Sequence, residues 1–262
     1  MKKIVVIVLT FSVPAIPAFA YLGQVVASFR APANYPLALA RANSNAYMWA
    51  YCNAAPYRIY RINSETGSVY GSWVSPQGSG TGGLAFSYGG TPGGNYLWIG
   101  SITTDRVYMC NYDTGSVYRS WSAGHDPFGL APQATADGGY NPQSIISSDT
   151  SPRYAWYHNP MTGSIIRSHT IGASVFDIAW DWRNRLVWGG TGNPGIVYGW
   201  NTSGSVVSTF RAPSPFPYAL TYFGEYLWVG CTTPSHFIYK CHCPSTAAVT
   251  PSSVGRIKVI FK

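Results

Sequence analysis

The chain has 262 residues and a formal net charge of +8; 46% of its residues are hydrophobic and 16% aromatic, but only 10% are charged. This composition excludes a coiled coil and a charged disordered chain, and the scattered positions of the 28 Gly and 19 Pro exclude a collagen repeat. The abundant Tyr and Trp favour β-strands, and the length is enough for one large all-β domain.

Residues 1–20 are predicted to be a signal peptide. Lys2 and Lys3 precede an apolar run from Ile4 to about Pro17, and residues 18–20 form the small-x-small pattern of a cleavage site. The alternative is a membrane anchor, for which the run is short. We therefore expect an exported protein, either extracellular, at the cell surface or periplasmic, with no transmembrane segment in the mature chain.

The remaining charges are spread singly. Beyond residue 20 the chain keeps fifteen basic and nine acidic residues, a net charge of +6, and twelve of the basic residues are arginines. Without a run of basic residues there is no groove to follow a phosphate backbone, so we expect no nucleic-acid partner. The charge is explained by solubility and isolated ion pairs; an acidic polysaccharide or an anionic cell surface is the alternative.

A repeat of five similar segments is the strongest signal in the sequence. Each segment carries a Gly, then a β-rich stretch that ends in an aromatic or His residue: 22–29, 66–73, 114–121, 162–169 and 203–210. Their glycines lie 44, 48, 48 and 41 residues apart. This spacing is near the period of about 40–50 residues of four-stranded propeller blades.

Three further strands are predicted in each repeat. A run ending in Asn precedes the Gly, and because Asn and Gly both tolerate a left-handed backbone, the two runs form an outer hairpin: 58–63, 106–111, 154–159 and 196–201. Upstream lies a strand that usually holds Trp: 47–50, 96–100, 144–147, 186–190 and 226–230. The first strand is short and rich in small residues, which suits the crowded axis: 36–40, 83–86, 128–131, 176–179 and 218–221.

These strands predict an all-β propeller domain over residues 21–243. Four repeats are complete, and the fifth, from about 217 to 243, has three strands. The segment 22–29 matches the missing fourth strand, and adding it there removes the free sheet edge at the seam of the ring. We therefore predict five four-stranded blades closed by the N-terminal strand, with six blades as the alternative.

The order of motifs resembles a known group of proteins. Pro-x-x-Leu-Ala, Leu-Trp-x-Gly, Val-Tyr-x-x-Asn and Thr-Gly-Ser-Val-x-x-Ser-Trp follow one another across residues 22–243, as in secreted β-propellers of the NHL, YncE and streptogramin-lyase-like group. The resemblance implies blade architecture but no single function, because such propellers serve as lyases, lactonases, sensors and scaffolds. That group usually has six or seven blades, and this chain lacks a recognisable acidic metal cage.

The C-terminal end is predicted to form a separate strand. Residues 244–253 are rich in Pro, Ser and Thr and form a linker, and residues 254–262 alternate apolar and basic side chains. We expect this strand to pair at the edge of its own propeller. The alternatives are donation to a neighbouring subunit, which would build a homo-oligomer or filament, and a sorting or anchoring signal.

The five cysteines are an odd number for an exported protein. Cys231, Cys241 and Cys243 are candidates for a disulfide, and buried thiols are the alternative. Cys241-His242-Cys243 also suggests zinc, but on a strand the two cysteines point to one face and the histidine to the other. We predict no metal site and no cofactor.

Three residues are candidates for catalysis. His125 lies beside Asp126 in a loop between blades, where the pair would act as a general base and its orienting carboxylate. Asp177 lies on an innermost strand, where an acid facing the channel would bind a cation or polarise water. The alternatives are a turn-forming Asp126 and a hydrogen-bonded structural Asp177.

Two matching loops, 30–36 and 211–217, provide the candidate binding residues. Arg30 and Tyr35 in one loop correspond to Arg211 and Phe216 in the other, and neighbouring prolines stiffen both loops. Exposed rings beside arginine stack on sugars or seat a protein partner; the alternative is that they buttress the blade junction.

The sequence therefore predicts a non-catalytic exported propeller that acts as a binding or structural scaffold. Its partner would be a protein or carbohydrate at the loop face, or further copies of the chain through the C-terminal strand. The alternative is a lyase- or lactonase-like enzyme whose site, on the loop face near the axis, uses His125 and the channel acids.

Overall fold

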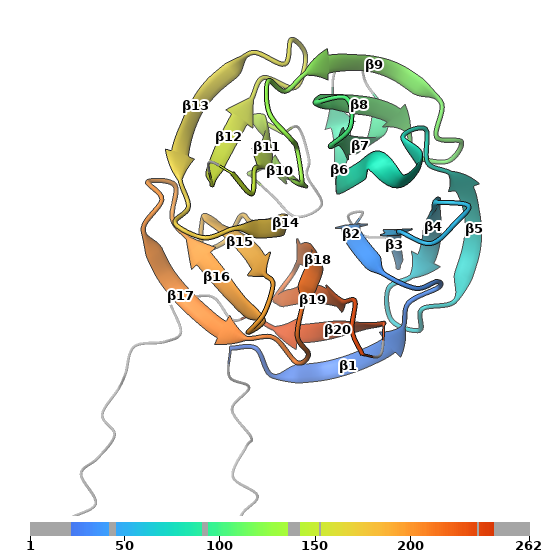
Figure 1. The fold of residues 1–262 in the computed structure, drawn as a ribbon, viewed down its shortest axis with the longest axis vertical. Coiled ribbons are helices and arrows are strands. Elements are labelled where there is room, and N and C mark those ends of the chain that lie inside the picture. The colour runs from blue at the N-terminus through green and yellow to red at the C-terminus, as the bar shows by residue number, and fades with distance from the viewer. Residues whose placement is uncertain are drawn as a thin grey trace, which may run out of the picture.

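The computed structural model describes residues 22–41, 46–90, 94–135, 142–151, 153–234 and 236–243. The strands of these residues form five four-stranded sheets arranged as blades around one axis (Figure 1). The prediction of an all-β propeller with five blades is confirmed, and the alternative of six blades is wrong. The predicted signal peptide, linker and C-terminal strand lie outside the described residues.

Each blade runs outward from an innermost strand at the axis. The first two blades are β2 (Pro36–Arg41), β3 (Tyr47–Cys52), β4 (Arg58–Asn63) and β5 (Val69–Val74), then β6 (Thr81–Gly90), β7 (Gly94–Ser101), β8 (Arg106–Asn111) and β9 (Val117–Ser122). The next two are β10 (Gly129–Gln133), β11 (Ser144–Ser148), β12 (Tyr154–His158) and β13 (Ile165–Thr170), then β14 (Val175–Asp181), β15 (Leu186–Thr191), β16 (Ile196–Trp200) and β17 (Val206–Arg211). The fifth contains β18 (Pro217–Phe223), β19 (Tyr226–Cys231), β20 (Phe237–His242) and β1 (Val25–Arg30), while a 3-10 turn, Gly78–Gly80, precedes β6.

The ring is closed by the N-terminal strand, as predicted. β1 pairs antiparallel with β20, from Val25 opposite Cys241 to Arg30 opposite Phe237. Beyond the strands, the Gly23 N–H donates to His242 O at 2.9 Å, and the His242 N–H donates to Gln24 O at 2.8 Å. The two ends of the described chain are thus locked in one sheet, so the ring opens only if these hydrogen bonds break.

The hydrophobic core lies between the blades. The buried apolar side chains form clusters that each combine residues of two neighbouring blades. Trp49 stacks on Phe86 of the next blade with 4.7 Å between ring centroids, and the Trp228 indole N–H donates to Ser64 O at 3.3 Å across another junction. The recurring tryptophans are at most 2% exposed and belong to these clusters: Trp49, Trp98, Trp188 and Trp228.

The repeated turn explains why the glycine recurs. Asn63 Oδ1 accepts hydrogen bonds from the N–H groups of Glu65 and Thr66 at 2.8 and 2.9 Å, and Gly67 follows with φ of 74°. The glycine then lies against the last ring of the preceding blade's outer strand, where a side chain would overlap it. The same overlap occurs at three other junctions, for Gly23 with Phe210, Gly67 with Phe29 and Gly115 with Trp73, as it does for Gly163 with Trp121. At the fifth junction a Cβ at Gly204 would meet Thr170 O at 2.5 Å and the His169 ring at 3.0 Å.

A cationic side chain also crosses each junction between blades. Two of these contacts are Lys240 with Glu65 at 2.7 Å and Arg183 with Glu225 at 3.2 Å. At the other junctions Arg61 pairs with Asp113, Arg119 donates to Met161 O and Arg167 donates to Thr202 O. Exposed contacts of this kind contribute roughly 0.2–1 kcal/mol each to the free energy of unfolding. Their main effect is to align the turn of one blade with the outer strands of its neighbour.

The outer strands are blunted by a bulge at the same place in every blade. One residue of the outer strand has no partner opposite it, and its side chain is exposed together with the apolar residue before it. The bulged residues are Val26, Tyr70, Tyr118, Ile166 and Val207. A bulge twists an edge strand and disfavours pairing with a further strand.

Within the described part of the chain, no helix is long and apolar enough to span a membrane.

The contact between turn and ring predicts a large effect of a single methyl group. Gly163 has φ of 75°, and a Cβ there would lie 2.5 Å from Trp121 Cγ. We expect Gly163→Ala to lower the free energy of unfolding in urea by about 3 kcal/mol, because strain and overlap add. Gly71→Ala is the control, since nothing lies near its Cβ position, and we expect a change within about 0.5 kcal/mol. Equal effects of the two substitutions would contradict this account.

Candidate functional site

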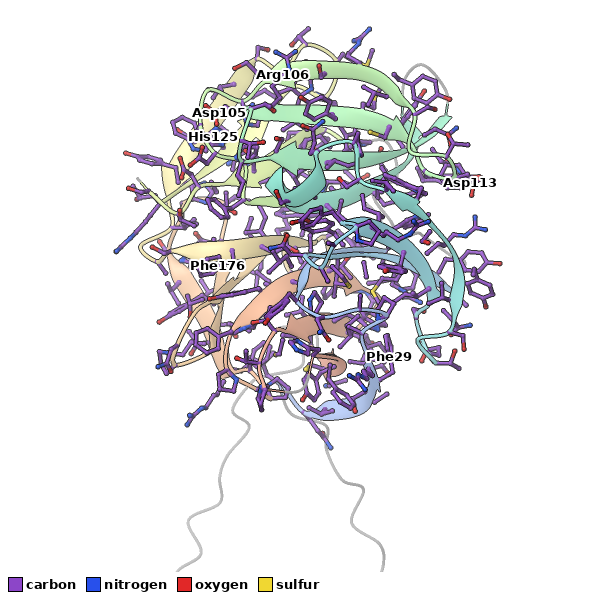
Figure 2. The ribbon with its side chains drawn as sticks, turned by 45° about the vertical axis from the view of Figure 1, so that its right-hand side comes forward. Phe29, Asp105, Arg106, Asp113, His125 and Phe176 are labelled. Carbon is purple, nitrogen blue, oxygen red and sulfur yellow. The ribbon has the colours of Figure 1, made fainter. Side chains whose placement is uncertain are left out.

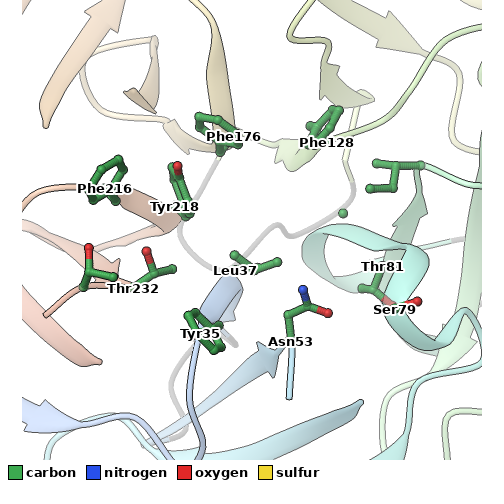
Figure 3. Close-up of a pocket in the computed structure, with 13 residues that line it drawn as sticks. Tyr35, Leu37, Asn53, Ser79, Thr81, Phe128, Phe176, Phe216, Tyr218 and Thr232 are labelled. Carbon is green, nitrogen blue, oxygen red and sulfur yellow. The ribbon is translucent and has the colours of Figure 1, made fainter. Parts of the chain in front are cut away.

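A pocket of about 450 Å³ opens at the axis of the ring. It lies on the face where the innermost strands begin and where the second strands turn into the third. All five blades contribute to its lining, which comprises Tyr35, Leu37, Asn53, Ser79, Thr81, Gly82, Ile102, Phe128, Phe176, Phe216, Tyr218, Thr232 and Thr233 (Figure 3).

One repeat position lines this pocket in every blade. It lies two residues before the leucine or isoleucine that faces the central channel in each innermost strand. Its occupants, blade by blade, are Leu37, Gly82, Phe128, Phe176 and Tyr218. Sequence analysis missed the last three as binding residues because they look like ordinary strand residues. Aligning the strand starts would have shown an aromatic column where the other blades carry Leu and Gly.

Aromatic rings in mutual contact form one side of the pocket (Figure 3). Phe176 lies 4.1 Å from Tyr218 and 6.1 Å from Phe128 between ring centroids, and Phe216 lies 5.7 Å from Tyr218. Because each ring is held by the next, this wall is formed before any ligand arrives. Such preorganisation lowers the entropic cost of binding.

Small polar side chains face these rings across the pocket (Figure 3). Asn53 Oδ1 accepts a hydrogen bond from the Tyr51 hydroxyl at 3.0 Å, and the Thr81 hydroxyl donates to Gly78 O at 3.1 Å. Their acceptors and donors are thus partly used within the protein. Among the described residues, the lining contains no Asp, Glu, Lys, Arg, His or Cys, so this part of the chain gives the pocket no formal charge.

The predicted binding residues are divided between two places. Tyr35 and Phe216 both line the pocket, and both have a left-handed backbone with φ of 56° and 60°, which is uncommon outside glycine. Arg30 and Arg211 instead end the outermost strands β1 and β17, remain exposed and do not line it. Of these four residues, Tyr35 and Phe216 are therefore part of the pocket, and the two arginines are not.

Asp177 lies fully buried beneath the pocket, directly after Phe176. Its Oδ2 accepts hydrogen bonds from the N–H groups of Leu220 at 2.8 Å and Leu39 at 3.3 Å, and Oδ1 accepts from Ile178 at 3.0 Å. Burial raises the pKa of this carboxyl well above its usual range, and the backbone donors, including Leu130, oppose that rise. Its lone pairs are committed to three neighbouring blades, which favours the structural alternative.

The channel beyond Asp177 is nearly filled. Leu39, Leu84, Leu130, Ile178 and Leu220 line it, and the remaining space is about 30 Å³. That volume holds one or two water molecules at most. The axial pocket is therefore closed at its inner end, and Asp177 lies beneath that end.

His125 lies away from the pocket and is not hydrogen-bonded to Asp126. Its Nδ1 lies 3.0 Å from Ala123 O, and its Nε2 lies 2.9 Å from Ser147 Oγ, which in turn lies 2.8 Å from His158 Nε2. Asp126 is exposed, and Figure 2 shows His125 close to Asp105. The predicted dyad of His125 and Asp126 is thus replaced by a bridge from His125 through Ser147 to His158.

The centre of this bridge is buried, and neither of its histidines carries a charge at pH 7. Ser147 and His158 are 0% exposed, so a substrate cannot reach the hydroxyl. Burial lowers the pKa of His125 and lowers that of His158 to about 4, with repulsion from His125 adding to the second effect. Both rings are therefore neutral at pH 7, and the single Ser147 proton serves one of them at a time.

The cysteines are all buried and free. No disulfide joins Cys231, Cys241 or Cys243, although these three share one core cluster between the fourth and fifth blades. Burial raises the pKa of the Cys231 and Cys241 thiols to about 12, so they are unreactive thiols in this state. Among the described residues, no cluster of three or more His, Cys, Asp and Glu is placed to hold a metal ion.

Comparison with known proteins gives a fold and no family. No protein-family model matches the sequence, and no curated protein matches it either. The chain is similar to the crystal structure of Myxococcus xanthus glutaminyl cyclase, with a TM-score of 0.63 and 9% identity over 84% of this chain and 95% of that chain. A chain of a mitotic checkpoint complex aligns with a TM-score of 0.49 and 12% identity, covering 79% of this chain and 63% of that one. At such identities the likeness shows the fold alone, and the resemblance to NHL, YncE and streptogramin-lyase-like propellers stays a prediction.

The position of Asp177 predicts a structural role that can be measured. Asn at this position keeps one acceptor but turns an amide N–H toward the backbone donors of Leu39 and Leu220. We expect Asp177→Asn to lower the free energy of unfolding in urea by about 3 kcal/mol. Asp113→Asn is the control, because it removes only an exposed ion pair with Arg61, and we expect less than about 1 kcal/mol. A loss at Asp177 no larger than at Asp113 would rule out the role.

The low pKa of His158 predicts a loss of stability in acid. The unfolded histidine binds a proton below its ordinary pKa of 6.5, whereas the folded one binds it only near pH 4. The stabilisation from the neutral ring is therefore complete above pH 6.5 and falls by about 3 kcal/mol toward pH 4. We expect the unfolding free energies of the wild type and His158→Gln to converge by that amount over this range. Parallel curves would show that His158 does not titrate in this way.

Proposed function

We propose that the chain is an exported, non-catalytic binding protein whose ligand site is the axial pocket. One observation carries the proposal: a preformed wall of aromatic rings faces a pocket whose lining holds no charged side chain. Ligand sites in proteins are usually concave, mostly apolar and largely formed in advance. The volume of about 450 Å³ lies within the usual range for such sites.

The chemistry of the lining favours binding over catalysis. A lyase or lactonase needs an acid or base within hydrogen-bond reach of its substrate. The titratable side chains of the lining are Tyr35 and Tyr218, and burial raises the pKa of Tyr218, which keeps that phenol protonated at pH 7. Asp177 lies below the floor with its oxygens committed to backbone donors, and His125 does not line the pocket.

The same lining favours one of the two partners expected at this face. Sugar hydroxyls would meet mainly carbon at Phe128, Phe176, Phe216 and Leu37, and burying them without partners is costly. A neutral apolar ring or side chain meets no such cost and packs against the aromatic wall. We therefore propose that the pocket takes an apolar group of a protein partner or of a small neutral molecule.

A neutral fluorescent probe tests this proposal. N-phenyl-1-naphthylamine has two apolar ring systems and no charge, so we expect it to bind the wild type saturably with a stoichiometry of one. Phe176→Ala and Tyr218→Ala each remove part of the aromatic wall, and we expect each to weaken the probe's Kd about tenfold. The readout is a fluorescence titration at equilibrium, with circular dichroism to confirm that the variants are folded.

Tyr118→Ala provides the matched control for the probe. Tyr118 is 60% exposed on the outer strand β9, so losing its ring should leave the Kd unchanged. If all three variants bind the probe alike, it sits elsewhere and the proposal fails. Equally tight binding of the anionic analogue 1-anilinonaphthalene-8-sulfonate would contradict the preference for a neutral ligand.

A further inference from the structure

A second hollow, of about 400 Å³, lies on the face opposite the axial pocket. Phe176, at the start of β14, lines the axial pocket, whereas Trp180, at the other end of the same strand, lines this second space. The hollow is formed where β10 ends, β11 begins and β14 turns into β15. We call this space the lower-face hollow. Its main side chains are Gln133, Thr135, Gln143, Trp180, Trp182 and Arg185.

Two tryptophans give the lower-face hollow a rigid floor. The Trp180 indole N–H donates to Ala134 O at 2.7 Å, which fixes the ring in place. Trp182 is half-buried and packs against two core clusters, one between the third and fourth blades and one between the fourth and fifth. Trp180 is only 8% exposed, so the half-buried Trp182 ring is the face that can meet the apolar C–H face of a sugar ring.

Planar polar groups line the rim above this floor. Gln133 Oε1 accepts a hydrogen bond from the Ser144 hydroxyl at 2.7 Å, and the Gln143 N–H donates to Gln133 O at 2.8 Å. The first bond uses the acceptor of the Gln133 amide, and the second joins the two backbones, which makes the glutamines neighbours at the start of the β10–β11 pair. The Gln133 amide therefore offers its N–H₂ donors to a sugar hydroxyl, and the exposed Gln143 amide offers both a donor and an acceptor.

Among the described residues that line the lower-face hollow, Arg185 carries the charge. Arg183 in the same turn pairs with Glu225, and Asp181 is buried, where it accepts from the Arg183 and Asn184 N–H groups. Arg185 is exposed and forms no ion pair within the described residues. Its φ of 55° is a conformation that residues with side chains seldom adopt, and it occurs here in the turn beside Trp182.

We infer that the lower-face hollow binds an acidic sugar, in a site separate from the axial pocket. The tryptophan floor would take the ring, the glutamines its hydroxyls, and the Arg185 guanidinium its carboxylate through paired hydrogen bonds. Among the described residues that line the axial pocket, the polar side chains are hydroxyls and the Asn53 amide, and none is charged. The two faces of the propeller are therefore built for different ligand chemistry.

Trigalacturonate is the probe that tests this inference, with intrinsic tryptophan fluorescence as the readout. We expect saturable quenching by trigalacturonate at low ionic strength, and at least tenfold weaker binding of the neutral trisaccharide cellotriose. Arg185→Gln should weaken trigalacturonate binding about tenfold and leave the weak binding of cellotriose unchanged. Arg153→Gln is the matched control, because Arg153 is also exposed with a left-handed backbone, at φ of 68°, but lies in a loop between a second and a third strand.

Three outcomes would overturn the inference. Equal binding by Arg185→Gln and Arg153→Gln would show that the charge lies elsewhere. Acetate that competes as well as the trisaccharide would show an adventitious anion contact without sugar recognition, and an unchanged affinity of the exposed-rim variant Gln143→Ala would argue against hydroxyl recognition. Phe176→Ala separates this test from that of the axial pocket, because it should leave trigalacturonate binding intact whichever way the probe of the axial pocket behaves.

Discussion

The centre of the ring depends on the hydrogen bonds that the carboxyl group of Asp177 accepts from the backbone. Five innermost strands converge at the axis, where each touches both of its neighbours. Side chains that face the next innermost strand have little room, as at Gly83 and Gly129, where a Cβ would overlap that strand's backbone. Backbone N–H groups there cannot reach water, so each unpaired one would cost about 1–3 kcal/mol. Asp177 occupies a position where the other blades carry Ala38, Gly83, Gly129 and Ala219, and its oxygens accept from Leu39, Ile178 and Leu220. One polar side chain thus closes the axis and supports the floor of the pocket.

Blade architecture is predictable from this sequence because the rules that set it are local. An Asn to Gly turn, an exposed apolar pair and a terminal ring all lie within a dozen residues, and each has a physical role in the structure. Gly163 must lack a side chain because Trp121 fills that space, and the same overlap recurs at three other junctions. The closing strand is predictable for the same reason, since Gly23 and Phe29 are the turn glycine and the terminal ring of a repeat that lacks its other strands.

The sites are less predictable because they combine residues from different repeats. Tyr35 and Phe216 stand out as rings in matching loops, but the wall that they join needs Phe128, Phe176 and Tyr218 from three blades. His125 was identifiable as a loop histidine, yet its partners Ser147 and His158 are on strands of the third blade. That blade has Ile146 where the others have the recurring Trp. This departure from the repeat was the sequence signal that the third blade packs differently around His125.

The two faces can differ in chemistry because every innermost strand runs the same way along the axis. All five strand starts meet at the axial pocket, and the later residues of the same strands line the channel toward the other face. A substitution at a strand start therefore changes one face and leaves the other as it was. Between them lie Asp177 and a channel of only about 30 Å³, through which no ligand passes. The neutral aromatic pocket and the hollow of Trp182 and Arg185 are thus separate spaces on opposite faces of the ring.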